Sequence, residues 1–219
     1  MTVVTEEATE KTVVPMATLP ASVLRDALHV HIAAGRDDTL PTLTGVQVSW
    51  SEGEPITFAA TDRYRLAVAT VEKGSGRGLT LAVGEGSFLL PRKDAIDLVK
   101  QLPKRKKRDT DLDVVPVNVT QTNGYVTFHW VHEGSTVSAE FRTLDGQFPK
   151  WQSLIPTEAK PVENMAYNPA YLADVAKLPS GSNQPVKWMF SGESRPALAH
   201  WDHDGIAWQY LLMPVRLHS

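Results

Sequence analysis

The chain has 219 residues, of which 42% are hydrophobic, and it contains no cysteine. Disulfides and thiolate chemistry are therefore excluded, no apolar run approaches the roughly 20 residues that span a bilayer, and a cytoplasmic protein of one or two domains is expected. The formal net charge of −3 conceals a basic segment, because residues 91–108 carry eight basic and two acidic side chains.

Residues 1–10 lack the basic and apolar regions of a signal peptide, and we expect a flexible N-terminus there. Three amphipathic helices are then predicted over residues 20–35, 91–102 and 168–178, each beginning at or next to a proline. The three prolines stand at 20, 91 and 169, so the spacings of 71 and 78 residues are typical of a repeated unit.

Short strands are predicted around each helix. They cover 11–16, 43–50, 56–60 and 65–71 in the first unit, 80–83, 87–90, 114–120, 125–132 and 135–143 in the second, and 162–167, 186–190, 196–201 and 206–217 in the third. Asn-Gly, Glu-Gly and Asp-Gly pairs at 123–124, 133–134 and 204–205 predict hairpin turns. The pattern indicates an α+β protein built from three β-α-β-β-β units, with a flexible joint near 72–78.

Six segments, in order along the chain, resemble the bacterial sliding clamp, the β subunit of the replicative DNA polymerase. They are "TLPTLTGV" with "FAATDRYRLAV", "LLPRKDAIDLVKQL", "RTLDGQFPKWQSLIP", "YNPAYLADV" and "YLLMPVRL". The resemblance implies the DNA-clamp fold, a ring around duplex DNA with helices inside and antiparallel sheets outside. The matches cover roughly residues 18–156, which resemble the central clamp domain, and residues 162–217, which resemble the second half of the last one. We therefore expect a clamp domain of two units over residues 11–156 and a half clamp domain with the C-terminal pocket strand over residues 157–219.

The resemblance also implies an outer pocket that grips linear motifs of polymerases and repair factors. Carried over residue by residue, its walls are Leu43, Thr61, Arg63, Tyr64, Arg65, Leu66, Pro156, Leu211, Met213, Pro214, Val215 and Arg216. The Leu, Met, Val and Pro side chains suit an apolar slot, and Arg65 and Arg216 suit a peptide backbone or an acidic flank. From "TDRYRL" alone the alternative is a surface turn made by Thr61 and Asp62, with Arg65 paired to Asp62.

The resemblance places the helices at the inner face of a ring, which implies sequence-independent contact with duplex DNA through basic side chains on the helices and through the "KRKKR" run. The candidates are Arg25, His29, Lys93, Lys100, Lys104, Arg105, Lys106, Lys107 and Arg108. Taken alone, "KRKKR" is also typical of a solvated loop. A clamp loader is a further partner that the resemblance implies.

Known rings of this family contain twelve units, so three units per chain predict a tetrameric ring, with a dimer as the fallback. The third unit lacks its mate, and its strands are expected to expose an unpaired edge beside an apolar helix flank.

No serine or carboxylate constellation indicates catalysis, and no cofactor or metal site is predicted. "HWDHDG", residues 200–205, offers metal-ligand side chains, but a strand entering a hairpin turn is the better interpretation. The leading hypothesis is a noncatalytic DNA clamp and processivity factor. The alternatives are a peptide-binding decoy or adaptor that does not encircle DNA and, last, a metal-dependent enzyme.

Overall fold

Twelve short strands and a few helices make up the described part of the chain, which a computed structural model gives for residues 16–72, 81–104 and 114–215. The strands are β1 (Ala17–Pro20), β2 (Gly45–Trp50), β3 (Ile56–Thr61), β4 (Arg65–Val71), β5 (Leu81–Ala82), β6 (Gly86–Pro91), β7 (Pro116–Thr122), β8 (Tyr125–His132), β9 (Ser135–Arg142), β10 (Lys187–Met189), β11 (Ala197–His203) and β12 (Ile206–Leu212). The helices are α1 (Ala21–Ala27), α2 (Arg92–Gln101) and α3 (Pro169–Asp174), with 3-10 turns η1 (Leu28–Ala33), η2 (Pro41–Leu43), η3 (Gln152–Leu154) and η4 (Val175–Lys177). Over these residues, no helix is both long and apolar enough to cross a membrane.

The strands form two antiparallel sheets, and each sheet contains the strand that leads into the helix of the other predicted unit. One sheet has the order β5-β1-β7-β8-β9 and the other β10-β11-β12-β4-β3-β2-β6. Thus β1, which leads into the first helix, pairs with β7 of the second predicted unit, and β6, which leads into the second helix, pairs with β2 of the first. The first two units are therefore one interlocked body rather than two independent sheets.

The third predicted unit differs from expectation at both of its ends. Residues 162–167 form no strand, and Ala166 makes a single bridge to Val215. Its last strand, β12, pairs along seven residues with β4, so the sheet continues across the predicted domain boundary at 156. We expected the strands of the third unit to expose an unpaired edge, and at β12 this expectation is wrong, because the backbone groups of β12 pair with those of β4. Among the described strands the remaining edge of this unit is β10, three residues long.

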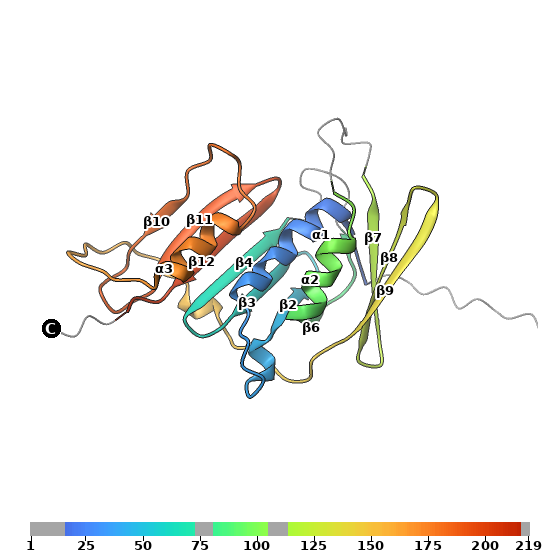
Figure 1. The fold of residues 1–219 in the computed structure, drawn as a ribbon, viewed down its shortest axis with the longest axis horizontal. Coiled ribbons are helices and arrows are strands. Elements are labelled where there is room, and N and C mark those ends of the chain that lie inside the picture. The colour runs from blue at the N-terminus through green and yellow to red at the C-terminus, as the bar shows by residue number, and fades with distance from the viewer. Residues whose placement is uncertain (1–15, 73–80, 105–113, 216–219) are drawn as a thin grey trace, which may run out of the picture.

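All three helices lie on the same side of the sheets (Figure 1). The main core lies between these helices and the sheets, and includes Leu24, Leu28 and Leu98, each at most 1% exposed. The opposite face of the seven-stranded sheet carries a second core, where Phe148 and Trp151 cover Val68 and Leu89. Because β4 is buried on both faces, its sequence "RLAVATV" is an almost continuous apolar run.

The three predicted hairpin turns are confirmed. Asn123, Glu133 and Asp204 have φ of 51–53°, and the glycine after each has φ of 77–79°. These values are those of type I′ turns, which join strands with the right twist.

Candidate functional site: a pocket at the junction of β4 and β12

The floor of the candidate pocket is apolar and is made by two strands from distant parts of the sequence. Leu66 of β4 stands directly opposite Leu211 of β12, and each is 3% exposed. Side chains that face each other across antiparallel strands lie on the same face of the sheet, here the face away from the helices. Ile155, which follows η3, packs against the same cluster.

A pocket of about 400 Å³ opens above this floor. Eight of the twelve residues carried over from the clamp resemblance line it, namely Thr61, Arg63, Tyr64, Arg65, Leu66, Pro156, Leu211 and Met213. Leu154 and Met213 stand at its walls with 56% and 40% of their surface exposed. The pocket therefore combines a buried apolar floor with exposed apolar side chains, as ligand sites commonly do.

The turn from Thr61 to Arg65 is fixed by its own side chains. The backbone N–H groups of Tyr64 and Arg65 both donate to Oδ1 of Asp62, at 3.1 Å each. The Thr61 hydroxyl donates to the carbonyl of Arg65 at 2.7 Å, and the backbone N–H of Met213 donates to the carbonyl of Tyr64 at 2.9 Å. The turn that the sequence offered as an alternative is thus present, and it forms one wall of the pocket.

Arg65 has a different environment from the one expected. Its guanidinium is paired with Asp62, at 3.0 Å from Nε to Oδ2, and with Asp174 of α3 through Nη1. It also lies over the ring of Tyr171, 4.3 Å from the centroid, and its side chain is only 9% exposed. Because the buried carboxylate of Asp174 and the half-buried carboxylate of Asp62 already hold it, Arg65 is a clasp between β4 and α3, and neither a surface pair nor a free donor for a ligand.

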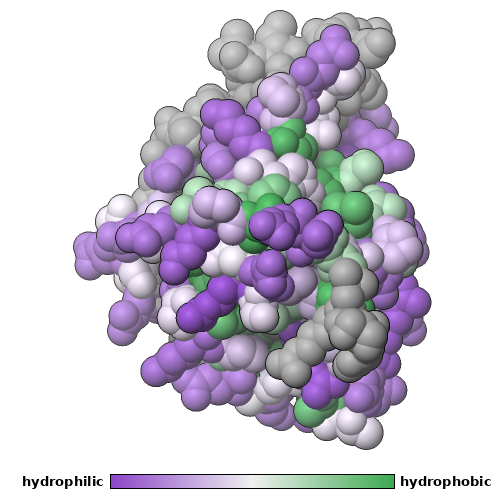
Figure 2. Space-filling view, turned by 90° about the vertical axis from the view of Figure 1, so that its left-hand side faces the viewer, coloured by the Kyte–Doolittle hydropathy of each residue, from purple (hydrophilic) through white to green (hydrophobic). Residues whose placement is uncertain are grey.

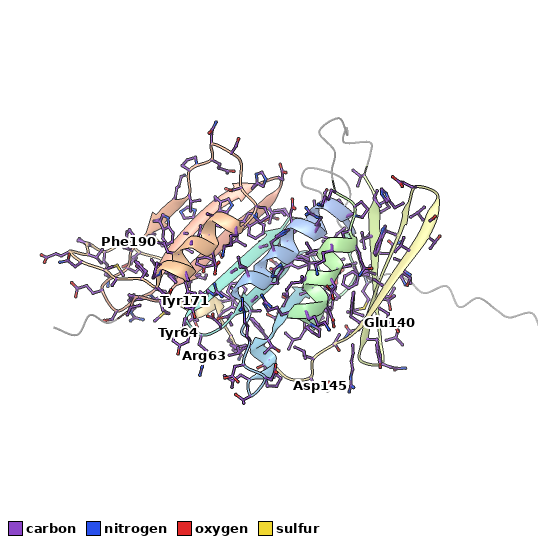
Figure 3. The ribbon with its side chains drawn as sticks, in the orientation of Figure 1. Arg63, Tyr64, Glu140, Asp145, Tyr171 and Phe190 are labelled. Carbon is purple, nitrogen blue, oxygen red and sulfur yellow. The ribbon has the colours of Figure 1, made fainter. Side chains whose placement is uncertain are left out.

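A second cavity of about 650 Å³ lies on the other side of the same turn. It shares Arg63, Tyr64 and Arg65 with the pocket and is closed by Leu43 and by Tyr171 of α3. The rings of Tyr64 and Tyr171 stack at 6.4 Å (Figure 3). The hydroxyl of Tyr210 donates to the carbonyl of Tyr171 at 2.9 Å, and burial raises the pKa of Tyr210 to about 12.

Three of the predicted wall residues lie elsewhere. Leu43 lines the second cavity, and Pro214 and Val215 follow the pocket wall without lining it. The backbone N–H of Val215 donates to the carbonyl of Ala166 at 2.7 Å. Arg216 lies outside the described residues.

Several lining residues were not predicted. They are Ser153, Leu154, Ile155, Thr157, Glu158, Lys160, Ser191, Ser194, Arg195 and Pro196. The segment "WQSLIP" carried part of this signal, since it belongs to the resemblance and includes Leu154 and Ile155. The loop between β10 and β11 carried none, because only the pairing of β11 with β12 brings it to the pocket.

Four of the candidate DNA-contacting residues, Arg25, His29, Lys93 and Lys100, belong to α1, η1 and α2. The helices α1 and α2 lie on one side of the sheets (Figure 1). Lys93 is exposed, Lys100 is exposed and 2.9 Å from Asp97, and Arg25 lies 3.6 Å from Asp26. His29 donates from Nδ1 to the carbonyl of Arg25 at 2.9 Å. Lys104 is exposed, and Arg105, Lys106, Lys107 and Arg108 lie outside the described residues.

Acidic side chains share this helix surface, so the described part of it is not strongly basic. Burial raises the pKa of Asp26, and burial together with Asp97 raises the pKa of Asp94.

His31 is held neutral, because burial, followed by the charges of His29 and Arg92, lowers its pKa to about 4.

No group of three or more His, Cys, Asp or Glu side chains in the described ranges is placed to hold a metal ion. His200 and Asp202 lie in β11, and Asp204 lies in the turn that follows.

Two antiparallel sheets on one side and a layer of helices on the other, with a pocket where the sheets of two units join, define a DNA-clamp protein. The model of the central domain of the DNA polymerase III β subunit matches residues 18–150. The chain therefore belongs to the bacterial sliding clamp family.

Relatives and solved structures agree with this family. The beta sliding clamp of Streptomyces coelicolor is 37% identical over 145 residues, which is 64% of this chain and 34% of that protein. The clamp of Micrococcus luteus is 32% identical over 150 residues, 68% of this chain and 43% of that protein. The β subunit of Streptococcus pyogenes matches in structure with a TM-score of 0.73 at 18% identity, over 99% of this chain and 68% of that chain. The chain thus spans about a third to two fifths of the length of these two curated relatives.

Proposed function

We propose that the chain is a noncatalytic clamp protein that holds a linear motif of a DNA polymerase, or of another replication protein, in the pocket. The observation that carries the proposal is the convergence of β4 and β12 on one pocket. Leu66 and Leu211 lie 145 residues apart in the sequence, yet they pair to form its floor. Eight residues expected from the family resemblance meet there.

The chemistry of the pocket suits a short apolar motif. A volume of about 400 Å³ accommodates two large side chains. Leu154 and Met213 are exposed, so a ligand that covers them removes their apolar surface from water, which favours binding. Met213 is also adaptable, because its unbranched side chain fits ligands of varied shape. A peptide containing a Leu-Phe pair should bind at micromolar strength, about 8 kcal/mol at 1 M standard state.

Duplex DNA is proposed to lie against the opposite, helix side. Lys93, Lys100 and Lys104 are exposed there, and the remaining residues of "KRKKR" follow directly in the sequence. A sequence-independent contact of this kind leaves the pocket free, so one chain can hold DNA and a polymerase at the same time. The clamp loader is proposed as a partner on the family resemblance alone.

A ring around DNA requires association of several chains, and a tetramer is proposed, with a dimer as the fallback. The side of the molecule that carries α3 and β10 has one of the two edges of the seven-stranded sheet. Leu172 of α3 is 44% exposed, but this end shows hydrophobic groups interrupted by hydrophilic ones rather than a continuous apolar face (Figure 2). Such an edge favours weak backbone pairing between chains over a large apolar contact.

Peptide titration tests the proposal. A fluorescent Leu-Phe peptide is titrated with the protein, with Met213→Ala and with Val131→Ala. Met213→Ala should weaken binding at least about fivefold, roughly 1 kcal/mol of lost apolar contact. Val131 is a matched control, because it is an exposed apolar residue, 59% accessible, on β8 of the other sheet. Absence of binding, or equal weakening by both changes, would show that the pocket is not the motif site.

A further inference from the structure

Arg63 has a backbone conformation that side chains avoid. Its φ is +79°, whereas the other non-glycine residues with positive φ, at the three hairpin turns, have 51–53°. The left-handed well that L-residues tolerate lies near +57°, and the glycines of the hairpin turns lie at 77–79°. Arg63 therefore stands, among the described residues, where glycine is the unstrained choice.

The surrounding turn holds Arg63 in this conformation. Its backbone N–H donates to Oγ1 of Thr61 at 3.2 Å, and the next two N–H groups both donate to Asp62. Arg65 then ties the end of the turn to α3 through Asp174. A strained residue that its neighbours fix from both sides is typical of a functional position.

The side chain of Arg63 is exposed and lines both cavities. Figure 3 shows it next to Tyr64. Its guanidinium lies 5.8 Å from the centroid of the Tyr64 ring, an arrangement that leaves N–H groups free to donate. Within the described residues Arg63 makes no ion pair. Asp37 of the second cavity accepts hydrogen bonds from the backbone N–H and the hydroxyl of Thr39, at 3.0 and 2.6 Å, and these bonds, with a smaller contribution from the charge of Arg63, lower the pKa of this carboxyl.

The charges around the pocket favour an anionic ligand. Besides Arg63, its lining contains Lys160 and Arg195, while Glu158 is its acidic residue. Arg65 adds no free charge because Asp62 and Asp174 neutralise it. An apolar floor edged by cations that form no ion pair with the described residues is complementary to a motif that carries a carboxylate beside its apolar anchor.

We propose that the pocket selects acidic linear motifs, and that Arg63 is the residue that recognises the carboxylate. The inference rests on the proposed function, since it assigns the chemistry of the ligand in the same pocket. The strained backbone places the guanidinium of Arg63 on the turn that lines both cavities.

The test compares two synthetic peptides. Both contain a Leu-Phe pair, flanked in one by two aspartates and in the other by two asparagines. The wild-type protein should bind the acidic peptide about five- to tenfold more tightly at low salt, and added salt should reduce that ratio. In Arg63→Gly the ratio should fall below about twofold, with an unchanged or higher melting temperature because glycine relieves the strain.

Arg63→Ala separates charge from backbone freedom. It keeps the strained conformation but removes the guanidinium, so it should lose the preference for the acidic peptide as fully as Arg63→Gly does. Arg142→Gln, an exposed position on β9 of the other sheet, removes the same charge without touching the pocket and should keep the wild-type ratio.

The outcomes distinguish the two levels of the proposal. If neither peptide binds, the proposed function itself fails. If both bind and Arg63→Gly and Arg63→Ala keep the full preference for the acidic peptide, the pocket stands and the role of Arg63 is wrong. If Arg142→Gln loses the preference for the acidic peptide to the same extent, the preference arises from the net charge of the protein, and this would also overturn the inference.

Discussion

The clasp between Arg65 and Asp174 offers a direct test of how the two halves of the pocket are held together. Asp174→Asn removes the carboxylate charge and keeps the shape of the side chain. Both partners are about nine-tenths buried, with 9% and 10% of their side-chain surface exposed. Removing one partner of a buried pair costs about 3–5 kcal/mol, because a charge is left uncompensated.

Two features of the site set the expected size of the effect. Asp62 remains 3.0 Å from Nε of Arg65, so part of the charge stays balanced, and about 2–3 kcal/mol is expected. Lys177 also contacts Asp174, at 2.6 Å, but its side chain is 62% exposed, so that pair adds little. For a chain of this size the loss corresponds to a fall in melting temperature of about 5–10 °C.

Urea unfolding of the wild type and two variants measures the effect. Asp97→Asn is the matched control, because Lys100 and Asp97 form a pair at 2.9 Å whose side chains are 68% and 42% exposed. That change should cost at most about 0.5 kcal/mol. Asp174→Asn should also weaken binding of the Leu-Phe peptide, since α3 no longer fixes the turn that forms the pocket wall.

A double variant checks the mechanism. Arg65→Met alone should destabilise strongly, because it leaves Asp174 buried with only the largely exposed Lys177 as its partner, and adding Asp174→Leu should recover most of the loss. A cost for Asp174→Asn no larger than that of Asp97→Asn, or additive costs in the double variant, would refute the view that the two residues act as one buried clasp.

Two further predictions concern DNA and assembly. Changing Lys104, Arg105, Lys106, Lys107 and Arg108 to Ser should weaken the dependence of duplex affinity on salt concentration and leave peptide affinity unchanged. Fluorescence anisotropy between low and moderate salt measures this dependence, and an unaltered dependence would favour the decoy or adaptor hypothesis. Light scattering at micromolar protein should give the mass of a tetramer or, failing that, a dimer, whereas a clean monomer of 24.1 kDa would rule out both.

Local signals in the sequence determined the helix starts and the hairpin turns of this protein. Proline at 20, 91 and 169 marked the starts of the helices, and the Asn-Gly, Glu-Gly and Asp-Gly pairs marked hairpin turns that the structure contains. These signals are readable because they depend on φ restrictions and capping within a few residues. The predicted strand at 162–167 lacked such support, and the structure has only a single bridge there.

The order of the strands and the chemistry of the site were decided by tertiary structure. The exchange of β1 and β6 between sheets, and the pairing of β12 with β4, join residues far apart in the sequence, and no local pattern specifies them. The same pairing brings Asp174 to Arg65 and converts an expected ligand donor into a buried clasp. The resemblance correctly named eight residues that line the pocket. Which basic side chains there remain without an ion pair depends on where each carboxylate lies after folding. For Arg65 and Arg63, only two positions apart, that difference is set by burial and partners, which the sequence does not contain.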